Sequence, residues 1–303
     1  MKRIMWPEKF PQNDDMFELL QKMSKASWCN NNEFTLDDIK CWLSNFTGEI
    51  FNVEDERKLA LWLLCNFTYY NKDEINHLCK IVYKELLHDL AINNTEYDKE
   101  KFDHIFDNVY FAAIGKVSES GGLLSYFFRQ QSQMSINKFF FLTNLPKDEQ
   151  GIIVFIDDVT LSGSTGMRFF NNNLKKLVYK KAYYLTLFAS QKAIDGISSN
   201  NITMIQSTVL GERERCFSKE SLIFADFPDL LDASKRLALN YGKKLSPKNP
   251  LGYKNGQYCF GLYYNTPNNT LPIFWSSNNW NPIFLRKEKS YNDWRRIEYD
   301  RFI

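Results

Sequence analysis

The segment from residue 151 to residue 166 restricts the possible folds more than any other part of the chain. It begins with an uninterrupted run of β-branched and aromatic residues, Ile152 to Ile156, which is typical of a parallel strand buried on both faces. Two carboxylates, Asp157 and Asp158, follow directly. Because open α/β sheets bind ligands outside the carboxyl ends of their strands, we expect the acid pair to lie at a binding edge.

The loop after the acid pair is rich in hydroxyl residues and glycine. Small residues of this kind allow a tight turn that directs backbone N–H groups at an anion. A helix expected to begin near Thr165 adds the positive end of its dipole. Carboxylates at a strand end can accept hydrogen bonds from vicinal ribose hydroxyls. The pattern therefore predicts a cradle for a sugar phosphate, although a βα turn that merely contains Asp, Ser and Gly is the alternative.

The order of strand, Asp-Asp, hydroxyl-glycine loop and Thr resembles the phosphoribosyl-diphosphate signature of type I phosphoribosyltransferases. The resemblance implies that Asp157 and Asp158 hold the ribose hydroxyls and act in catalysis. It also assigns the 5′-phosphate to the loop residues Thr160, Ser162, Gly163, Ser164 and Thr165. The fold it implies is an α/β protein with a parallel-sheet phosphoribosyltransferase-like core.

The composition agrees with a packed intracellular protein of more than one domain. The chain has 303 residues, of which 44% are hydrophobic, and its net charge of +2 gives no broad electrostatic reason to bind nucleic acid. Its six cysteines contain no Cys-x-x-Cys pair, so buried free thiols in a cytoplasmic protein are expected. No apolar run approaches the length of a membrane span, and no secretion signal begins the sequence.

Residues 1–107 are predicted to form an all-helical N-terminal domain. Thr35 is a candidate N-cap, and Asn71 with Glu74 resembles a capping box before an amphipathic helix. A strand is not predicted in this region. Because basic and acidic residues are mixed on its helices, a solvated surface is favoured over a DNA-binding one.

Residues 108–303 are predicted to form the phosphoribosyltransferase-like α/β domain, with irregular elements after about residue 242. Strands are expected near residues 109–114, 139–142, 152–156, 181–189 and 202–210. The loop between the first of these strands and the next helix either grips a diphosphate, as its position in the resemblance suggests, or is a plain connection. The candidate diphosphate residues are Lys116, Ser118, Glu119, Ser120 and Gly121.

The C-terminal part combines a helical segment, residues 218–242, with two irregular motifs. Gly242 is predicted to terminate the helix as its C′ residue. The motif at 265–275 contains Asn268, Asn269 and Trp275, which either form a base-binding or lid element or pack as a Pro-rich turn. With the helical N-terminal region and the motif at 250–253, these elements resemble the bacterial effector group PRTase-CE, which occurs with anti-phage systems and some retrons.

The resemblance to a salvage enzyme has two departures. The segment before the signature, residues 143–150, is too short for the usual flexible lid, and a helical domain replaces the usual base-recognising hood. The leading hypothesis is therefore an enzyme that cleaves or transfers a ribosyl phosphate such as a nucleotide or phosphoribosyl diphosphate. Mg²⁺ would accompany the substrate diphosphate. The implied partners are a defence-system protein or a reverse transcriptase with its RNA–DNA complex. The alternative is a non-catalytic nucleotide sensor that binds a protein or nucleic acid through its helical domain.

Overall fold

A computed structural model describes residues 3–28, 35–95, 98–115, 120–198, 201–284 and 286. In this part of the chain, five parallel strands form the main sheet in the order β3-β2-β4-β5-β6. Their bounds are Val109–Ala113 (β2), Phe139–Phe140 (β3), Ile152–Thr160 (β4), Lys181–Ser190 (β5) and Ile202–Leu210 (β6). The predicted parallel α/β core is therefore confirmed, with the acid-pair strand at its centre.

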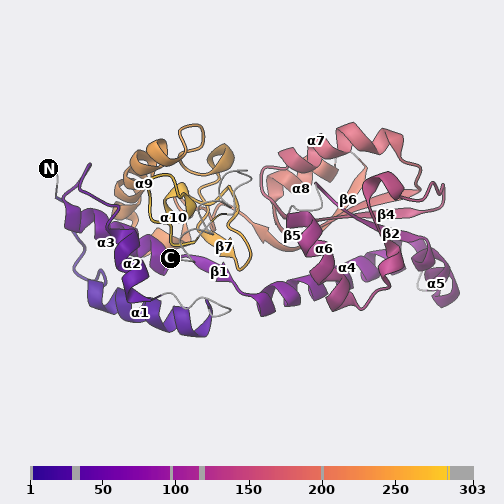
Figure 1. Cartoon of the computed structure of the whole chain (residues 1–303), viewed down its shortest axis with the longest axis horizontal. Coiled ribbons are helices and arrows are strands. Elements are labelled where there is room, and N and C mark those ends of the chain that lie inside the picture. Colours follow the sequence, from indigo (N-terminus) through magenta and orange to yellow (C-terminus); the bar gives the residue numbers. More distant parts are fainter. Residues whose placement is uncertain are drawn as a thin grey trace, which may run out of the picture.

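Helices cover both faces of the sheet (Figure 1). Side chains of β4 alternate between the faces: Ile152, Val154 and Ile156 pack with one group of helices, and Ile153 and Phe155 pack with the other. The first group comprises α4 (Lys72–Thr95) and α6 (Ser120–Ser132), and the second comprises α7 (Ser164–Asn173) and α8 (Gln191–Ser198). Burial on both faces explains why the run has no polar residue before the acid pair.

The remaining N-terminal helices are α1 (Asn13–Ala26), α2 (Leu36–Leu43), α3 (Val53–Cys65) and α5 (Lys99–Asp107). The predicted caps are confirmed: the Thr35 side chain accepts a hydrogen bond from the Asp38 N–H, and Asn71 and Glu74 bond reciprocally before α4. One element was not predicted. A short strand, β1 (Thr68–Tyr70), interrupts the helices between α3 and α4.

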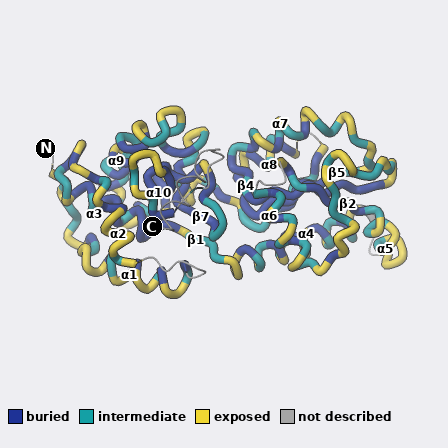
Figure 2. The backbone as a smooth tube through the Cα atoms, in the orientation of Figure 1, coloured by how far each residue is buried: buried dark blue, intermediate teal, exposed yellow. Residues whose placement is uncertain are grey.

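Strand β1 pairs in parallel with β7 (Phe260–Leu262), which lies far along the chain. This pairing belongs to a second lobe, in which α1 to α3 share one hydrophobic cluster with α9 (Leu231–Leu245) and α10 (Pro272–Trp275). Figure 1 shows this lobe at the opposite end of an elongated molecule from the main sheet, with β1 and β7 between them. Figure 2 shows buried backbone segments both in the main sheet and in the second lobe. The division at residue 107 stays a prediction, and the packing joins residues on both sides of it.

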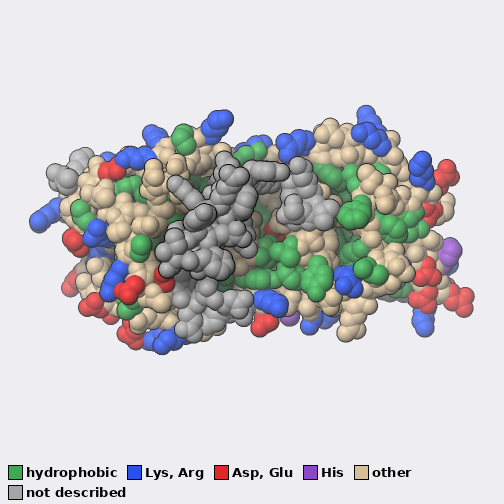
Figure 3. Space-filling view, viewed as in Figure 1, with side chains coloured by type: hydrophobic (Ala, Val, Ile, Leu, Met, Phe, Trp, Pro, Cys, Tyr) green, Lys and Arg blue, Asp and Glu red, His purple; other side chains and the backbone are tan. Residues whose placement is uncertain are grey.

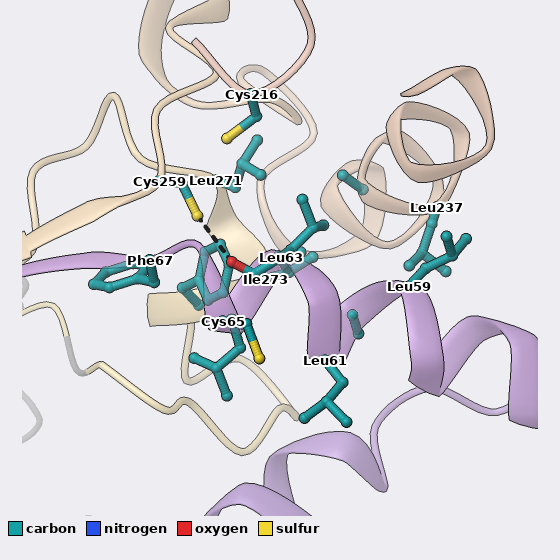
Figure 4. Close-up of a cluster of buried hydrophobic side chains, with 14 of the residues drawn as sticks. Leu59, Leu61, Leu63, Cys65, Phe67, Cys216, Leu237, Cys259, Leu271 and Ile273 are labelled. Atoms are coloured by element: carbon teal, nitrogen blue, oxygen red, sulfur yellow. Dashed lines mark hydrogen bonds between the residues drawn. The ribbon is translucent and has the colours of Figure 1, made fainter. Parts of the chain in front are cut away.

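The cysteines agree with the prediction of buried free thiols. Five described cysteines are free, of which Cys41 is exposed and Cys65, Cys79, Cys216 and Cys259 are buried. Figure 4 shows three of the buried thiols among leucines, with the Cys259 Sγ donating to the Leu63 carbonyl at 3.4 Å. Burial raises the pKa of Cys65 and of Cys79 to about 12, so these thiols stay protonated. Cys29 lies outside the described residues.

Charged side chains are dispersed over the face drawn in Figure 3, with Lys and Arg interspersed among Asp and Glu. This mixture agrees with the small net charge. Of the described helices, none is both long and apolar enough to cross a membrane.

The prediction that Gly242 ends a helix is wrong. Helix α9 continues to Leu245, and Ser246 is its C-cap residue. Gly242 lies inside the helix because the chain returns against it: an added Cβ would lie 1.9 Å from the Pro250 carbonyl oxygen. Close packing against the Pro250 backbone, and not helix termination, therefore explains why this position is a glycine.

Replacing Gly242 with Ala should lower the free energy of unfolding by about 1–3 kcal/mol or more, because helix α9 and the backbone at Pro250 must move apart. Gly196 of α8 is the matched control, since an added Cβ there meets no atom within 4 Å. Gly196→Ala should leave stability unchanged or raise it by up to about 1 kcal/mol. Urea unfolding of both variants measures the difference. Equal stability of the two variants would contradict this packing.

Candidate functional site

The acid pair lies within the central strand and close to its carboxyl end. Strand β4 runs four residues beyond the predicted limit of Ile156, because its neighbour β5 continues to pair with it: Asp157 lies opposite Thr186, and Thr160 lies opposite Ala189. Asp157 and Asp158 are only 8% and 7% exposed. Consecutive strand residues point to opposite faces, so the two carboxylates have different surroundings.

Asp157 faces the layer of α7 and α8. Its Oδ2 accepts a hydrogen bond from the Tyr184 hydroxyl at 2.9 Å, and its Oδ1 accepts one from the Asp158 backbone N–H at 3.0 Å. The Tyr184 ring packs against Phe170 of α7. Asp157 is thus held beneath the helix that the candidate phosphate loop opens.

Asp158 faces the layer of α4 and α6. Its Oδ1 accepts hydrogen bonds from the Ser120 hydroxyl at 3.0 Å and from the Val159 N–H at 2.8 Å. Its Oδ2 accepts a longer bond, 3.3 Å, from the Tyr264 hydroxyl. Ser120 begins α6, and Tyr264 follows β7, so this carboxylate joins the main sheet to the second lobe.

Burial is the main cause that raises the pKa of both carboxyl groups above their ordinary value. For Asp157 the neighbouring Asp158 charge raises the pKa further, and the Tyr184 hydrogen bond opposes the rise. Burial also raises the pKa of Tyr184 and of Tyr264, and the adjacent carboxylates add to it. Both phenols therefore stay protonated and act as donors at neutral pH.

The candidate phosphate loop connects β4 to α7. Gly163 has a left-handed φ of 69° and lies against Ala193, where a side chain would be both strained and crowded. The hydroxyls of Ser162 and Ser164 lie 2.8 Å apart, Thr165 is exposed at the first turn of α7, and Thr160 is buried at the end of β4. The structure thus brings the loop hydroxyls to the N-terminus of a ten-residue helix, where an anion is favoured.

The candidate diphosphate loop is described only in part. Lys116, Ser118 and Glu119 lie outside the described residues. Ser120 is hydrogen-bonded to Asp158, and Gly121 lies against the backbone of Ile114, just after β2, and of Ile156 within β4. The start of α6 is therefore next to the acid pair, as the predicted order of elements requires.

The candidate base or lid residues of the 265–275 motif lie in the second lobe. Trp275 is buried, and its indole N–H donates to the Thr270 carbonyl at 2.9 Å. Asn269 is also buried and donates to the Tyr253 carbonyl at 3.1 Å, whereas the Asn268 side chain is exposed. These contacts give Trp275 and Asn269 packing and positioning roles.

Three tyrosines at the site were not predicted: Tyr184, Tyr253 and Tyr264. Tyr184 contacts Asp157, Tyr264 contacts Asp158, and the Tyr253 hydroxyl lies 3.4 Å from the Ser164 hydroxyl. Tyr184 appears in the sequence only as one residue of an apolar strand, and the other two come from irregular segments. The available signal was the high aromatic content, 16%, which does not identify individual positions.

The segment between β3 and β4 does not extend over the site. It contains a short turn at Leu142–Asn144 and then returns to the start of β4. There the Asp148 carboxylate accepts a hydrogen bond from Tyr110, near the beginning of β2. The acid pair lies at the other end of the strands, so this segment is anchored away from it.

Among the described residues, no group of three His, Cys, Asp or Glu side chains gathers as a metal site. The acid pair nevertheless fits an ion that arrives with a diphosphate, since Mg²⁺ in such sites uses one or two carboxylates together with substrate oxygens. Because Asp157 and Asp158 face opposite sides of β4, one of them at a time would be a protein ligand of such an ion.

Residues 39–286 match the profile of the PRTase-CE family. No curated protein matches the chain. Solved structures with similar features include an orotate phosphoribosyltransferase from Aeropyrum pernix, with 11% identity, a TM-score of 0.28, and coverage of 42% of this chain and 70% of that one. A hypothetical protein from Neisseria gonorrhoeae with bound ppGpp has 12% identity and a TM-score of 0.34, and the match covers 57% of this chain and 96% of that one. AQ2163 protein from Aquifex aeolicus has 13% identity and a TM-score of 0.31, and the match covers 59% of this chain and 87% of that one.

Replacing Asp157 with Asn should raise the melting temperature at pH 7 by a few degrees. The folded state raises the pKa of this carboxyl group, so folding favours its protonated form. The contribution of this group to the free energy of unfolding is therefore lost as the pH rises from about 4 through the raised pKa. Asn keeps the shape without the charge. The gain should shrink as pH approaches 4, which thermal melts between pH 4.5 and 8 would measure. Exposed Asp195, replaced with Asn, is the control, and a D157N variant that is less stable at pH 7 would contradict the argument.

Proposed function

Since this chain belongs to the PRTase-CE family, we propose that it binds a ribosyl phosphate at the carboxyl end of β4 and cleaves or transfers the bond at the sugar C1. One observation carries the proposal. The acid pair and the Ser162–Thr165 loop occupy one strand–loop–helix unit, with carboxylates and anion-binding N–H groups side by side. The ligands that match both features carry a ribose and a phosphate, and they include nucleotides, phosphoribosyl diphosphate and related compounds.

The residues supply orientation and charge. Asp157 and Asp158 would hold the ribose hydroxyls, and the loop would hold the 5′-phosphate. As the bond from C1 to its leaving group breaks, positive charge develops on the sugar ring, and a fixed carboxylate beside it stabilises that charge. Ser120, Tyr184 and Tyr264 keep the carboxylates in place through their hydrogen bonds. A diphosphate substrate would bring Mg²⁺, which neutralises its charge.

The short anchored segment between β3 and β4 supports a reaction other than nucleotide salvage. A salvage enzyme must exclude water from the cationic transition state, which is the task of a lid. Tyr110 and Asp148 hold this segment at the opposite end of the sheet. Since this segment supplies no lid, we take water as the acceptor, and hence hydrolytic cleavage of the ribosyl bond.

A non-catalytic sensor is the second candidate. The observation that favours it is that each oxygen of the acid pair already accepts a hydrogen bond, from Ser120, Tyr184, Tyr264 or one of two backbone N–H groups. Such a site is rigid and suits recognition. In either case we extend the proposal to anti-phage defence, with a protein or a reverse-transcriptase complex as partner, because the family resemblance implies that role.

The decisive test is mass spectrometry of a nucleotide mixture incubated with the full chain. We expect a free base or a ribose phosphate to accumulate over many turnovers. The D157N/D158N variant should lose about 100-fold or more of the rate, since fixed charge at a reacting centre contributes on that scale. Asp195→Asn is the matched control and should retain full activity. Saturable binding without product would favour the sensor, and neither binding nor product in the unaltered protein would overturn the proposal.

A further inference from the structure

The segment Leu251–Gln257 has an unusual backbone. Gly252, Lys254, Asn255 and Gln257 all have positive φ angles, of 87°, 49°, 58° and 59°. For a residue with a side chain, the left-handed conformation is sterically unfavourable. Three such residues within four positions persist only where the surroundings determine them, and strain of this kind gathers at ligand clamps.

The surroundings that determine this conformation come from the Asn268–Asn269 segment. The Tyr253 N–H donates to the Asn268 carbonyl at 2.7 Å, and the Asn269 side chain donates to the Tyr253 carbonyl at 3.1 Å. Gly252 and Gly256 lie so close that an added Cβ would be 2.2 and 2.7 Å from the Asn269 carbonyl oxygen. Both sides of Tyr253 are therefore held, and the position of its ring is set by the backbone.

This arrangement brings Tyr253 to the candidate phosphate loop. Its hydroxyl lies 3.4 Å from that of Ser164, which in turn lies 2.8 Å from that of Ser162. The Tyr253 side chain is half-buried, and the Lys254 Nζ lies 5.9 Å from the centre of its ring. A phenol donor thus lies beside the N-terminus of α7, and an exposed ammonium group lies near the ring of that phenol.

We propose that Tyr253 is a phosphate-binding residue and that Lys254 adds the positive charge that selects a phosphorylated ligand. The Tyr253 hydroxyl donates to the terminal phosphate held by the Ser162–Thr165 loop, from the side opposite the loop N–H groups. The inference rests on the proposed function and deepens it: two residues outside the loop distinguish a phosphate monoester from the corresponding nucleoside or free ribose.

Calorimetric titration of the full chain with ribose 5-phosphate tests the proposal. Tyr253→Phe removes one oxygen, and we expect binding to weaken by about 10-fold or more, the usual effect of losing a hydrogen bond to a charged group. Lys254→Gln should weaken binding several-fold and reduce its dependence on salt, because an exposed charge is screened. The matched controls are Tyr126→Phe on α6 and Lys248→Gln, both exposed, and neither should change the affinity.

The outcomes separate this inference from its premise. In one outcome the D157N/D158N variant loses binding, while Tyr253→Phe and Lys254→Gln keep the affinity and salt dependence of the unaltered protein. The inference would then be wrong, because Tyr253 only packs, and the proposed function would stand. If the unaltered protein does not bind ribose 5-phosphate, both fall. A melting temperature no more than about 2 °C below that of the unaltered protein confirms that each variant is folded. Equal affinity of the unaltered protein for ribose and ribose 5-phosphate would also overturn the inference.

Discussion

The parallel pairing of β1 with β7 is the interaction on which the arrangement of the site depends. It joins Thr68–Tyr70, which follows the first helices, to Phe260–Leu262 near the other end of the described chain. The backbone continues the ladder with the Tyr263 N–H donating to the Tyr70 carbonyl at 2.9 Å. The next residue, Tyr264, reaches Asp158. A pairing of three residues in each strand therefore contributes to the position of the second lobe relative to the acid pair.

The part of the molecule that follows from local sequence was predictable. Ile152–Ile156 predicts a buried strand, and the hydroxyl-glycine loop predicts the start of α7, because strand burial and helix initiation depend on neighbouring residues. The caps at Thr35 and Asn71 were predictable for the same reason. What lay beyond prediction is set by contacts between distant segments. Three features depend on which distant segments meet: the β1–β7 pairing, the glycine at position 242 and the three tyrosines at the site. The local pattern of hydrophobic residues does not predict such contacts.

The site combines two features that work against stability. Two adjacent carboxyl groups are buried in the central strand, where desolvation raises the pKa of both and the charge of Asp158 raises that of Asp157 further. The Leu251–Gln257 segment adds a strained backbone. A sequence selected for stability alone would replace the acids with neutral residues and relax the loop. Their presence on the two sides of one strand–loop–helix unit is what a binding function requires, and the surrounding hydrogen bonds offset part of the energetic penalty.

The hydrophobic cluster that unites α1 to α3 with α9 and α10 also has a consequence for biosynthesis. The first helices leave the ribosome long before residues 216–284, which provide the other half of their core, so that lobe cannot be completed while the main sheet is being made. Contacts of such large sequence separation form late and slowly. Tyr253 and Tyr264 arrive with the same late segment. A nascent chain therefore contains the acid pair and its loop before Tyr253 and Tyr264 have been synthesised, and the site is completed only after this later segment has left the ribosome.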